Sequence, residues 1–142
     1  VADLVQIPAS GSASYKGHMV ASVLHNNALY MEHGDATFTV NFAASASSGT
    51  LTVTNFDGGG LTGTFSSISS ASPGGHSFSS NLSGTGRLSG VSGGHNSSFY
   101  TDKGGNHIAG IGGDIHANGT VDGTNYFVDG VHVQACSGGV CQ

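Results

Sequence analysis

Apolar and polar residues alternate along most of the chain with a period of two, the pattern of strands that bury one face. The clearest run is Asp35 to Ala43, in which Ala36, Phe38, Val40 and Phe42 alternate with small polar residues. No apolar pattern with a helical period lasts longer than about one turn. The sequence therefore predicts an all-β protein built from half-buried antiparallel strands.

Further segments carry weaker versions of this pattern and are separated by residues that favour turns. His25-Asn26-Asn27 and Asn118-Gly119 are predicted hairpin turns, because asparagine and glycine tolerate the left-handed backbone conformation. Asp57 to Gly60 is predicted to be a loop. The other predicted strands are Ser14 to Leu24, Ala28 to His33, Thr50 to Phe56, Leu61 to Ile68, His76 to Val91, a strand ending at Phe99 and Tyr100, His107 to His116, and Asn125 to Gln134.

Short strands separated by turn signals, in a chain of 142 residues, are typical of one domain. We predict a single antiparallel β-barrel of about eight strands with meander topology, filled by its own side chains. The barrel is expected over 11–134. An arm or edge strand at 1–10 precedes it, and a tail at 135–142 follows it.

The segment from Ser97 to His116 is predicted to complete the barrel. Phe99 and Tyr100 are expected to plug the interior, and Ile108 to Ile115 is expected to be the closing strand. Strict alternation places Ile108 and Ile111 on opposite faces of that strand. Its many glycines are attributed to strong curvature of the sheet, since no P-loop lysine or following helix accompanies them.

Low charge gives the chain the profile of an extracellular or surface β protein. Charged residues make up 8% of the sequence, against roughly 25% in globular proteins. The net charge is -5 with three lysines and arginines, so no nucleic-acid partner is expected. The sequence contains neither an apolar run of helical spanning length nor an aromatic girdle, so the protein is not expected to span a membrane.

The only two cysteines, Cys136 and Cys141, lie close together near the end of the sequence. A disulfide can close so short a loop because Gly138 and Gly139 supply flexibility. The alternative is a metal-binding or reactive thiol pair, although no second cysteine pair exists to complete a zinc site. A disulfide would place the protein in an oxidising compartment.

Several glycine-rich motifs extend over most of Gly11 to Val133. They are Gly-Ser-Ala-Ser-Tyr-Lys-Gly at 11–17, Ala-Thr-Phe-Thr-Val-Asn-Phe at 36–42, Leu-Ser-Gly at 88–90, Ser-Phe-Tyr at 98–100 and Ile-Ala-Gly at 108–110. Together they resemble the β-barrel domain of the transferrin-binding protein B-like surface-lipoprotein family. The resemblance implies an eight-stranded barrel that is secreted, periplasmic or displayed on the surface of a Gram-negative bacterium.

Members of that family capture iron-carrying host proteins, haem or complement regulators. The resemblance therefore implies a binding module in haem or iron acquisition. This sequence lacks a binding lobe beyond the barrel and a lipid-bearing cysteine at position 1, and no family binding residue maps onto it. Transferrin binding itself is therefore not implied.

Histidine is unusually frequent, with eight residues in the chain. His25 and His33 flank one predicted hairpin, so they are candidate ligands for haem iron or a transition metal. His107 and His116 would lie roughly 30 Å apart on one strand and cannot share an ion. The alternative is that the histidines are exposed polar residues in a charge-poor chain.

No pattern of an enzyme active site stands out, because the sequence has neither a Gly-x-Ser-x-Gly elbow nor a His-Glu-x-x-His motif. We therefore expect no enzymatic activity. The leading hypothesis is a bacterial binding module for a protein partner or a small ligand. The alternative is a structural or assembly subunit that forms an oligomer or larger complex, with the arm at 1–10 joining a neighbour.

Overall fold

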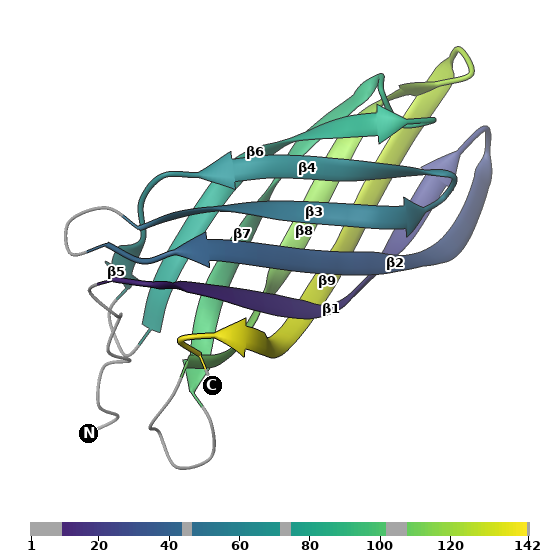
Figure 1. Ribbon diagram of the computed structural model, residues 1–142. Helices are drawn as coiled ribbons and strands as arrows, with labels where there is room; N and C mark the ends of the chain where they lie inside the picture. The colour runs from purple at the N-terminus through teal and green to yellow at the C-terminus, as the bar shows by residue number, and fades with distance from the viewer. Residues whose placement is uncertain (1–9, 44–46, 72–74, 102–107, 142) are drawn as a thin grey trace.

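The alternating pattern becomes nine β-strands in the computed structural model, which describes residues 10–43, 47–71, 75–101 and 108–141. Eight of them pair in the antiparallel order β1-β2-β3-β4-β6-β7-β8-β9, and β9 pairs with β1 (Figure 1). The predicted all-β barrel with meander topology is confirmed. The strands are β1 Ser12–His25, β2 Ala28–Asn41, β3 Ser48–Phe56, β4 Gly59–Phe65, β5 Ser69–Ala71, β6 Gly75–Gly86, β7 Val91–Thr101, β8 Ile108–Val121 and β9 Thr124–Gly139.

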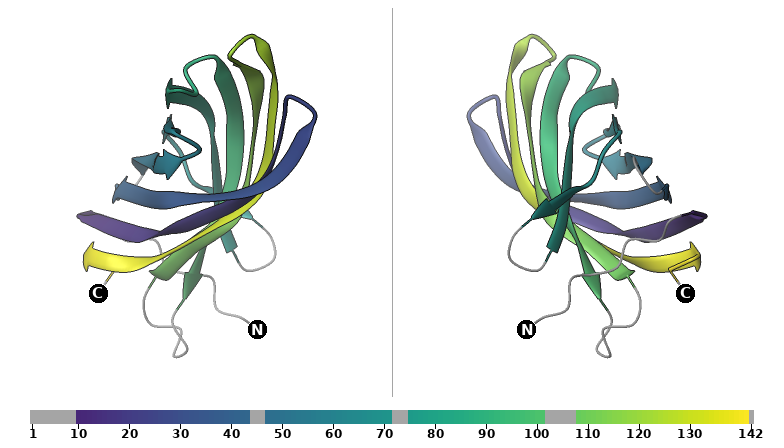
Figure 2. Two further views of the ribbon diagram at one scale, coloured as in Figure 1. Left: turned by 90° about the vertical axis from the view of Figure 1, so that its right-hand side faces the viewer. Right: turned by 90° about the vertical axis from the view of Figure 1, so that its left-hand side faces the viewer.

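Two strand pairings turn the sheet into a barrel. β1 pairs with β9 over most of its length, so the first and last strands lie side by side. β4 pairs with β6, and the short β5 pairs with a different part of β6. The predicted closing strand is β8, and it lies between β7 and β9 rather than at either junction. Figure 2 shows the strands wrapping around a common axis from two opposite sides.

The strands predicted at Ala28 to His33 and Asp35 to Ala43 are one continuous strand, β2. Gly34 lies in its middle. A Cβ at this position would lie 2.8 Å from Thr54 O and 3.0 Å from Phe56 Cβ. This glycine marks a close approach of β2 to the end of β3 and is not a break in the strand.

The two predicted hairpin turns have different outcomes. Asn26 and Asn27 form the β1–β2 turn, with φ angles of 52° and 63°. Asn118-Gly119 is not a turn: both residues lie inside β8, and the β8–β9 turn is at Asp122-Gly123. Glycine is needed at 119 because a Cβ there would overlap the backbone at the start of β7.

Aromatic rings fill the interior of the barrel. Phe38 on β2 and His95 on β7 have ring centroids 5.5 Å apart. Because β2 and β7 are four strands apart in either direction around the eight-stranded barrel, this contact crosses the interior. Phe78 and His132 also lie 5.5 Å from Phe38. The barrel is therefore filled by side chains, as predicted for its size.

Only one of the two residues predicted to fill the interior lies there. Phe99 is buried in the interior, where its ring lies 4.9 Å from that of Phe78. Tyr100 is 57% exposed on the outer face, so its assignment to the interior is wrong. Adjacent residues of a strand point to opposite faces, and only one of the two can plug the barrel.

An irregularity in strand pairing also changes the predicted faces of β8. Thr101 pairs with Ile108 and Tyr100 pairs with Gly110, so Ala109 is left out of the register. This bulge brings both Ile108 and Ile111 into the interior. The expectation that they lie on opposite faces is wrong.

Candidate functional site

The outer face of β1, β2 and β9 carries large apolar side chains. Near the β1–β2 turn, Leu24 pairs with Leu29 on β2 and with Phe127 on β9. These three side chains are 45%, 73% and 48% exposed, respectively. They form an apolar row across three neighbouring strands.

The apolar surface continues along β9. Val131 pairs with Val20 on β1, and Val133 follows on the same side of the strand. The Tyr100 ring lies over Gly112 on β8, since a Cβ at that glycine would be 3.2 Å from the ring and 3.8 Å from Val133. We call this surface the apolar face. Its exposed residues are Val20, Leu24, Leu29, Met31, Tyr100, Phe127, Val131 and Val133.

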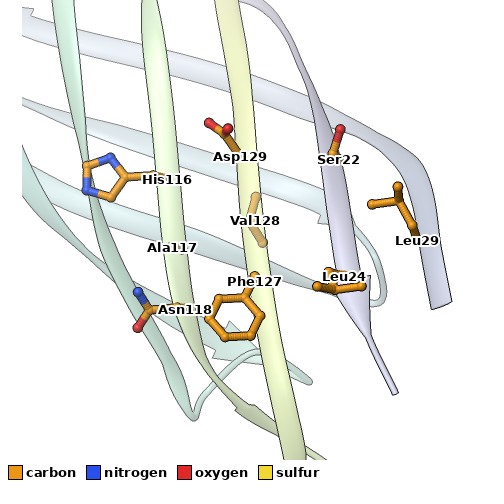
Figure 3. Close-up of a pocket in the computed structure, with 9 residues that line it drawn as sticks. All are labelled: Ser22, Leu24, Leu29, His116, Ala117, Asn118, Phe127, Val128 and Asp129. Atoms are coloured by element: carbon orange, nitrogen blue, oxygen red, sulfur yellow. The ribbon is translucent and has the colours of Figure 1, made fainter. Parts of the chain in front are cut away.

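Two shallow hollows lie along the outer side of β8 and β9. One, of about 330 Å³, is lined by Leu24, Leu29 and Phe127, with His116 and Asp129 at its other edge (Figure 3). The other, of about 500 Å³, lies over the glycines of β8 between Tyr100 on one side and Val131 and Val133 on the other. Glycines on β8 beside large residues on β9 create the second hollow, whereas His116 and Asn118 line the β8 side of the first.

Two carboxylates lie on the outer side of the sheet between the two hollows. Asp129 pairs with His116, and Asp114 pairs with Val131, so the two aspartates are diagonal neighbours on β8 and β9. Asn96 donates a 3.3 Å hydrogen bond to Asp114. Among the described residues, Lys16 is the one Lys or Arg on the outer side of β1, β2, β8 and β9. The outer side between the hollows is therefore acidic.

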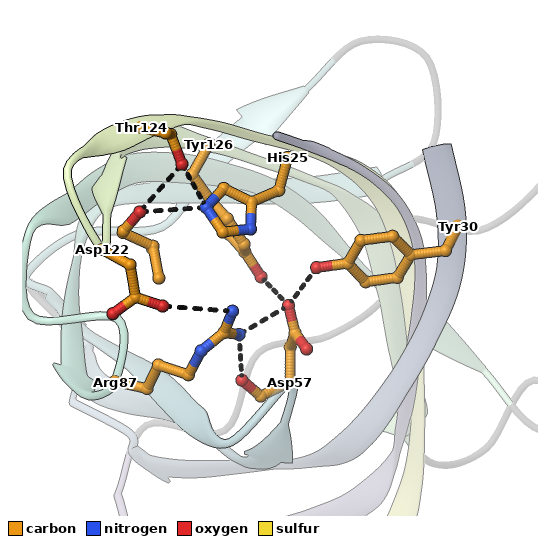
Figure 4. Close-up of polar contacts among 8 residues, drawn as sticks. His25, Tyr30, Asp57, Arg87, Asp122, Thr124 and Tyr126 are labelled. Atoms are coloured by element: carbon orange, nitrogen blue, oxygen red, sulfur yellow. Dashed lines mark hydrogen bonds and ion pairs between the residues drawn. The ribbon is translucent and has the colours of Figure 1, made fainter. Parts of the chain in front are cut away.

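A second polar cluster closes one end of the barrel. The carboxylate of Asp57, in the β3–β4 turn, accepts hydrogen bonds of 2.6 Å from Tyr30 and 2.7 Å from Tyr126. Arg87, from the β6–β7 turn, lies 3.0 Å from the same carboxylate oxygen. Figure 4 shows these side chains pointing toward one another across the end of the barrel. The cluster joins elements that are far apart in the sequence.

These contacts, together with burial, shift the pKa values of the groups involved. Burial acts to raise the pKa of Asp57, but hydrogen bonds from Tyr30 and Tyr126 and the charge of Arg87 outweigh it and lower the pKa overall. Burial, followed by the bond to Asp57, raises the pKa of Tyr30 to about 12. The same causes raise the pKa of Tyr126. At neutral pH the cluster therefore holds an ionised carboxylate between neutral phenols and a guanidinium.

The candidate ligands His25 and His33 lie apart. His25 points into the end of the barrel, where Nε2 donates a 2.9 Å hydrogen bond to Val121 O and lies 2.7 Å from Thr124 Oγ1. His33 is exposed on the outer side of β2, opposite Val20. The sheet separates the two rings, so they do not form one ligand site. His107 lies outside the described residues.

Two other histidines form a hydrogen-bonded chain inside the barrel. Ser97 Oγ lies 2.8 Å from His95 Nδ1 and 2.9 Å from His132 Nε2. His132 Nδ1 lies 2.9 Å from Gln134 Oε1. With the Gln134 amide in this orientation, His132 Nδ1 donates a hydrogen bond to Gln134 Oε1. His132 Nε2 then accepts from the Ser97 hydroxyl, whose oxygen accepts from His95 Nδ1. His95 Nε2 then has no proton and no partner among the described residues.

Burial keeps both of these imidazoles neutral. Burial, and then the proximity of His132, lowers the pKa of His95 to about 4. Burial also lowers the pKa of His132, against the opposing effects of Gln134 and Asp114. The Ser97 side chain is itself buried, with 3% exposure, so this serine is not open to a substrate in solution. The chain is a polar network within the core.

The predicted disulfide between Cys136 and Cys141 is present. Strand β9 runs to Gly139, so it includes the first part of the segment assigned to a tail. After the disulfide loop turns back, Val140 N donates a 2.9 Å hydrogen bond to Ser12 O. The disulfide thus holds the last residues of β9 against the start of β1.

The described residues include no helix that is long and apolar enough to cross a membrane. They also include no group of three or more His, Cys, Asp or Glu side chains placed to hold a metal ion. Comparisons with family models, curated proteins and solved structures find no match to the chain. The resemblance to the transferrin-binding protein B-like family therefore stays a prediction.

Sequence reasoning missed both the Asp57 cluster and the apolar face. Asp57 stands in a glycine-rich turn, where only the closed barrel brings Tyr30 and Tyr126 to it. The apolar face had a visible signal, because Val131 and Val133 alternate with His132. Alternation fixes which residues share a face, but it does not state which face points inward.

Proposed function

We propose that this protein is a non-enzymatic binding module that engages a protein partner through the apolar face on the outside of the barrel. The observation that carries the proposal is the contrast between the filled interior and the exposed row Leu24, Leu29 and Phe127. Exposed apolar patches of this kind are typical of interaction sites. A small ligand such as haem would have to displace core rings such as Phe38 to enter the barrel.

Two further observations support a location at the surface of a bacterium or outside it. The disulfide is typical of oxidising compartments, and the low charge is typical of surface β proteins. The resemblance to the transferrin-binding protein B-like family adds iron or haem acquisition as a context. In that context the apolar face would contact an iron-carrying protein rather than iron itself.

Photo-crosslinking from defined positions tests the proposal. Benzoyl-phenylalanine replaces Val131 on the apolar face, or Thr52 on the outer side of β3 as the matched control. The proteins are irradiated with the cells and surrounding fluid of a producing culture. We expect a defined protein adduct from position 131 and none from position 52.

Competition then establishes that the adduct reports specific binding. Unlabelled wild-type barrel should suppress the adduct, whereas the F127S/V131S variant should not. Equal adducts from positions 131 and 52, or suppression by both competitors, would refute the proposal. A stoichiometric haemin complex, seen by its Soret band and unaffected by F127S/V131S, would also refute it. A product containing only two copies of this chain would support the assembly alternative instead.

A further inference from the structure

We infer that the partner presents an extended segment with two apolar side chains flanking two cationic ones, and that this segment lies along β8 and β9. This inference rests on the proposed function and specifies the chemistry of the partner. The two hollows set the apolar positions, and the carboxylates between them set the charged positions. The occupant is therefore a basic, amphipathic polypeptide.

The spacing of the hollows fits one extended strand. Phe127 lines the first hollow and Val133 lines the second, and they lie six residues apart on β9. Six residues of a strand span about 20 Å. A partner strand can therefore place side chains in both hollows from its first and seventh residues, which point to the same side.

The floor of the groove favours close approach by such a segment. Gly110 and Gly112 carry no side chains on the outer side of β8. Tyr100 and Val133 rise on either side of Gly112, so an aliphatic side chain would be enclosed laterally. At the other hollow, Leu24, Leu29 and Phe127 offer apolar contacts from three strands.

The charges decide between possible occupants. Asp114 and Asp129 are diagonal neighbours without a Lys or Arg beside them on the outer side of β8 or β9 among the described residues. A second copy of this chain would bring its own aspartates into the same interface, and an anionic lipid surface would meet the same repulsion. Cations at the third and fifth residues of a partner strand would instead lie near the two carboxylates.

A pair of capped synthetic peptides provides the test. The probe is Leu-Ser-Lys-Ser-Lys-Ser-Leu, and the control is Leu-Ser-Glu-Ser-Glu-Ser-Leu, each titrated into the folded protein and followed by amide chemical shifts. We expect the lysine peptide to bind about tenfold more tightly than the glutamate peptide, and to weaken as salt is raised. The D114N/D129N variant should lose this preference. D35N/D122N, which removes two carboxylates away from the groove, should keep it.

The outcomes separate this inference from the proposed function. Equal binding of both peptides, lost in F127S/V131S, would overturn the charge assignment and leave the apolar face intact. Lysine-peptide binding that persists in F127S/V131S would refute the proposed role of the apolar face in binding. Binding of neither peptide, or stronger binding to vesicles containing phosphatidylglycerol than to the lysine peptide, would also overturn the inference.

Discussion

The hydroxyl of Tyr126 donates a 2.7 Å hydrogen bond to the carboxylate of Asp57, 69 residues away in the sequence. Tyr30 donates to the same oxygen, and Arg87 lies beside it. This one carboxylate joins the β3–β4 turn to β2, to β9 and to the β6–β7 turn. It therefore fixes the end of the barrel from which the apolar row of Leu24, Leu29 and Phe127 begins.

Replacing Asp57 by Asn should destabilise the barrel by about 1–3 kcal/mol, because the charged acceptor of hydrogen bonds from the buried Tyr126 and the partly buried Tyr30 is lost. The free energy of unfolding in urea measures this effect. Asp122→Asn is the control: its carboxylate is mostly exposed and lies 4.0 Å from Arg87. That change should cost less than about 0.5 kcal/mol. Equal losses from the two variants would contradict a special role for Asp57.

Stability should fall in mild acid because of the buried histidines. In the unfolded chain His95 takes up a proton near pH 6.5, whereas its folded-state pKa is about 4. The unfolded state therefore binds more protons between these values, and the contribution of His95 to stability falls by about 3 kcal/mol across this window. His132, with its lowered pKa, acts in the same direction.

Urea unfolding at a series of pH values measures the slope of the free energy of unfolding against pH. His95→Gln should flatten it between about pH 6.5 and 4, since the group that takes up the proton on unfolding is gone. His18→Gln is the control, because His18 is exposed on the outer side of β1. A slope that is unchanged by His95→Gln would show that the core histidine is not the acid-sensitive group.

The disulfide should stabilise the end of β9 more than the whole barrel. The loop between Cys136 and Cys141 is short, so replacing both by serine should lower the free energy of unfolding by at most about 2 kcal/mol. Amide hydrogen exchange should become fast at Val140, which bonds to Ser12. The backbone amides of β3 and β4 should remain protected from exchange. A loss of protection throughout the barrel would contradict this local role.

Glycine at position 17 should be essential for the pairing of β1 with β9. A Cβ there would overlap the backbone of Val133, so Gly17→Ala should destabilise the protein by about 1–3 kcal/mol. Gly138→Ala is the matched control, because a Cβ at this position has no atom within 4 Å. Thermal unfolding of the two variants measures the difference. Similar melting temperatures would show that the strands can separate to accept a methyl group.

Alternation in the sequence was sufficient to predict most of the barrel. Asp35 to Ala43 shows the cleanest pattern, and its residues Phe38 and Val40 lie in the interior as expected. Local rules failed where long-range packing decides the structure. Asn118-Gly119 has the composition of a turn, but the glycine is there because the start of β7 lies against it.

The candidate site was harder to predict for the same reason. His25 and His33 are close in the sequence, yet strand parity places them on opposite sides of the sheet. His132 lies inside although valines flank it, because Ser97 and Gln134 supply its hydrogen bonds there. Those partners come together only after the barrel has closed.

Methyl chemical-shift mapping tests the proposed binding face most directly. The barrel, labelled at leucine and valine methyl groups, is titrated with the partner recovered by crosslinking from position 131. Binding through the apolar face should shift the methyl signals of Leu24, Leu29, Val131 and Val133, while those of the interior residues Leu51 and Val53 should not shift. Shifts confined to interior methyl groups would contradict binding through the apolar face.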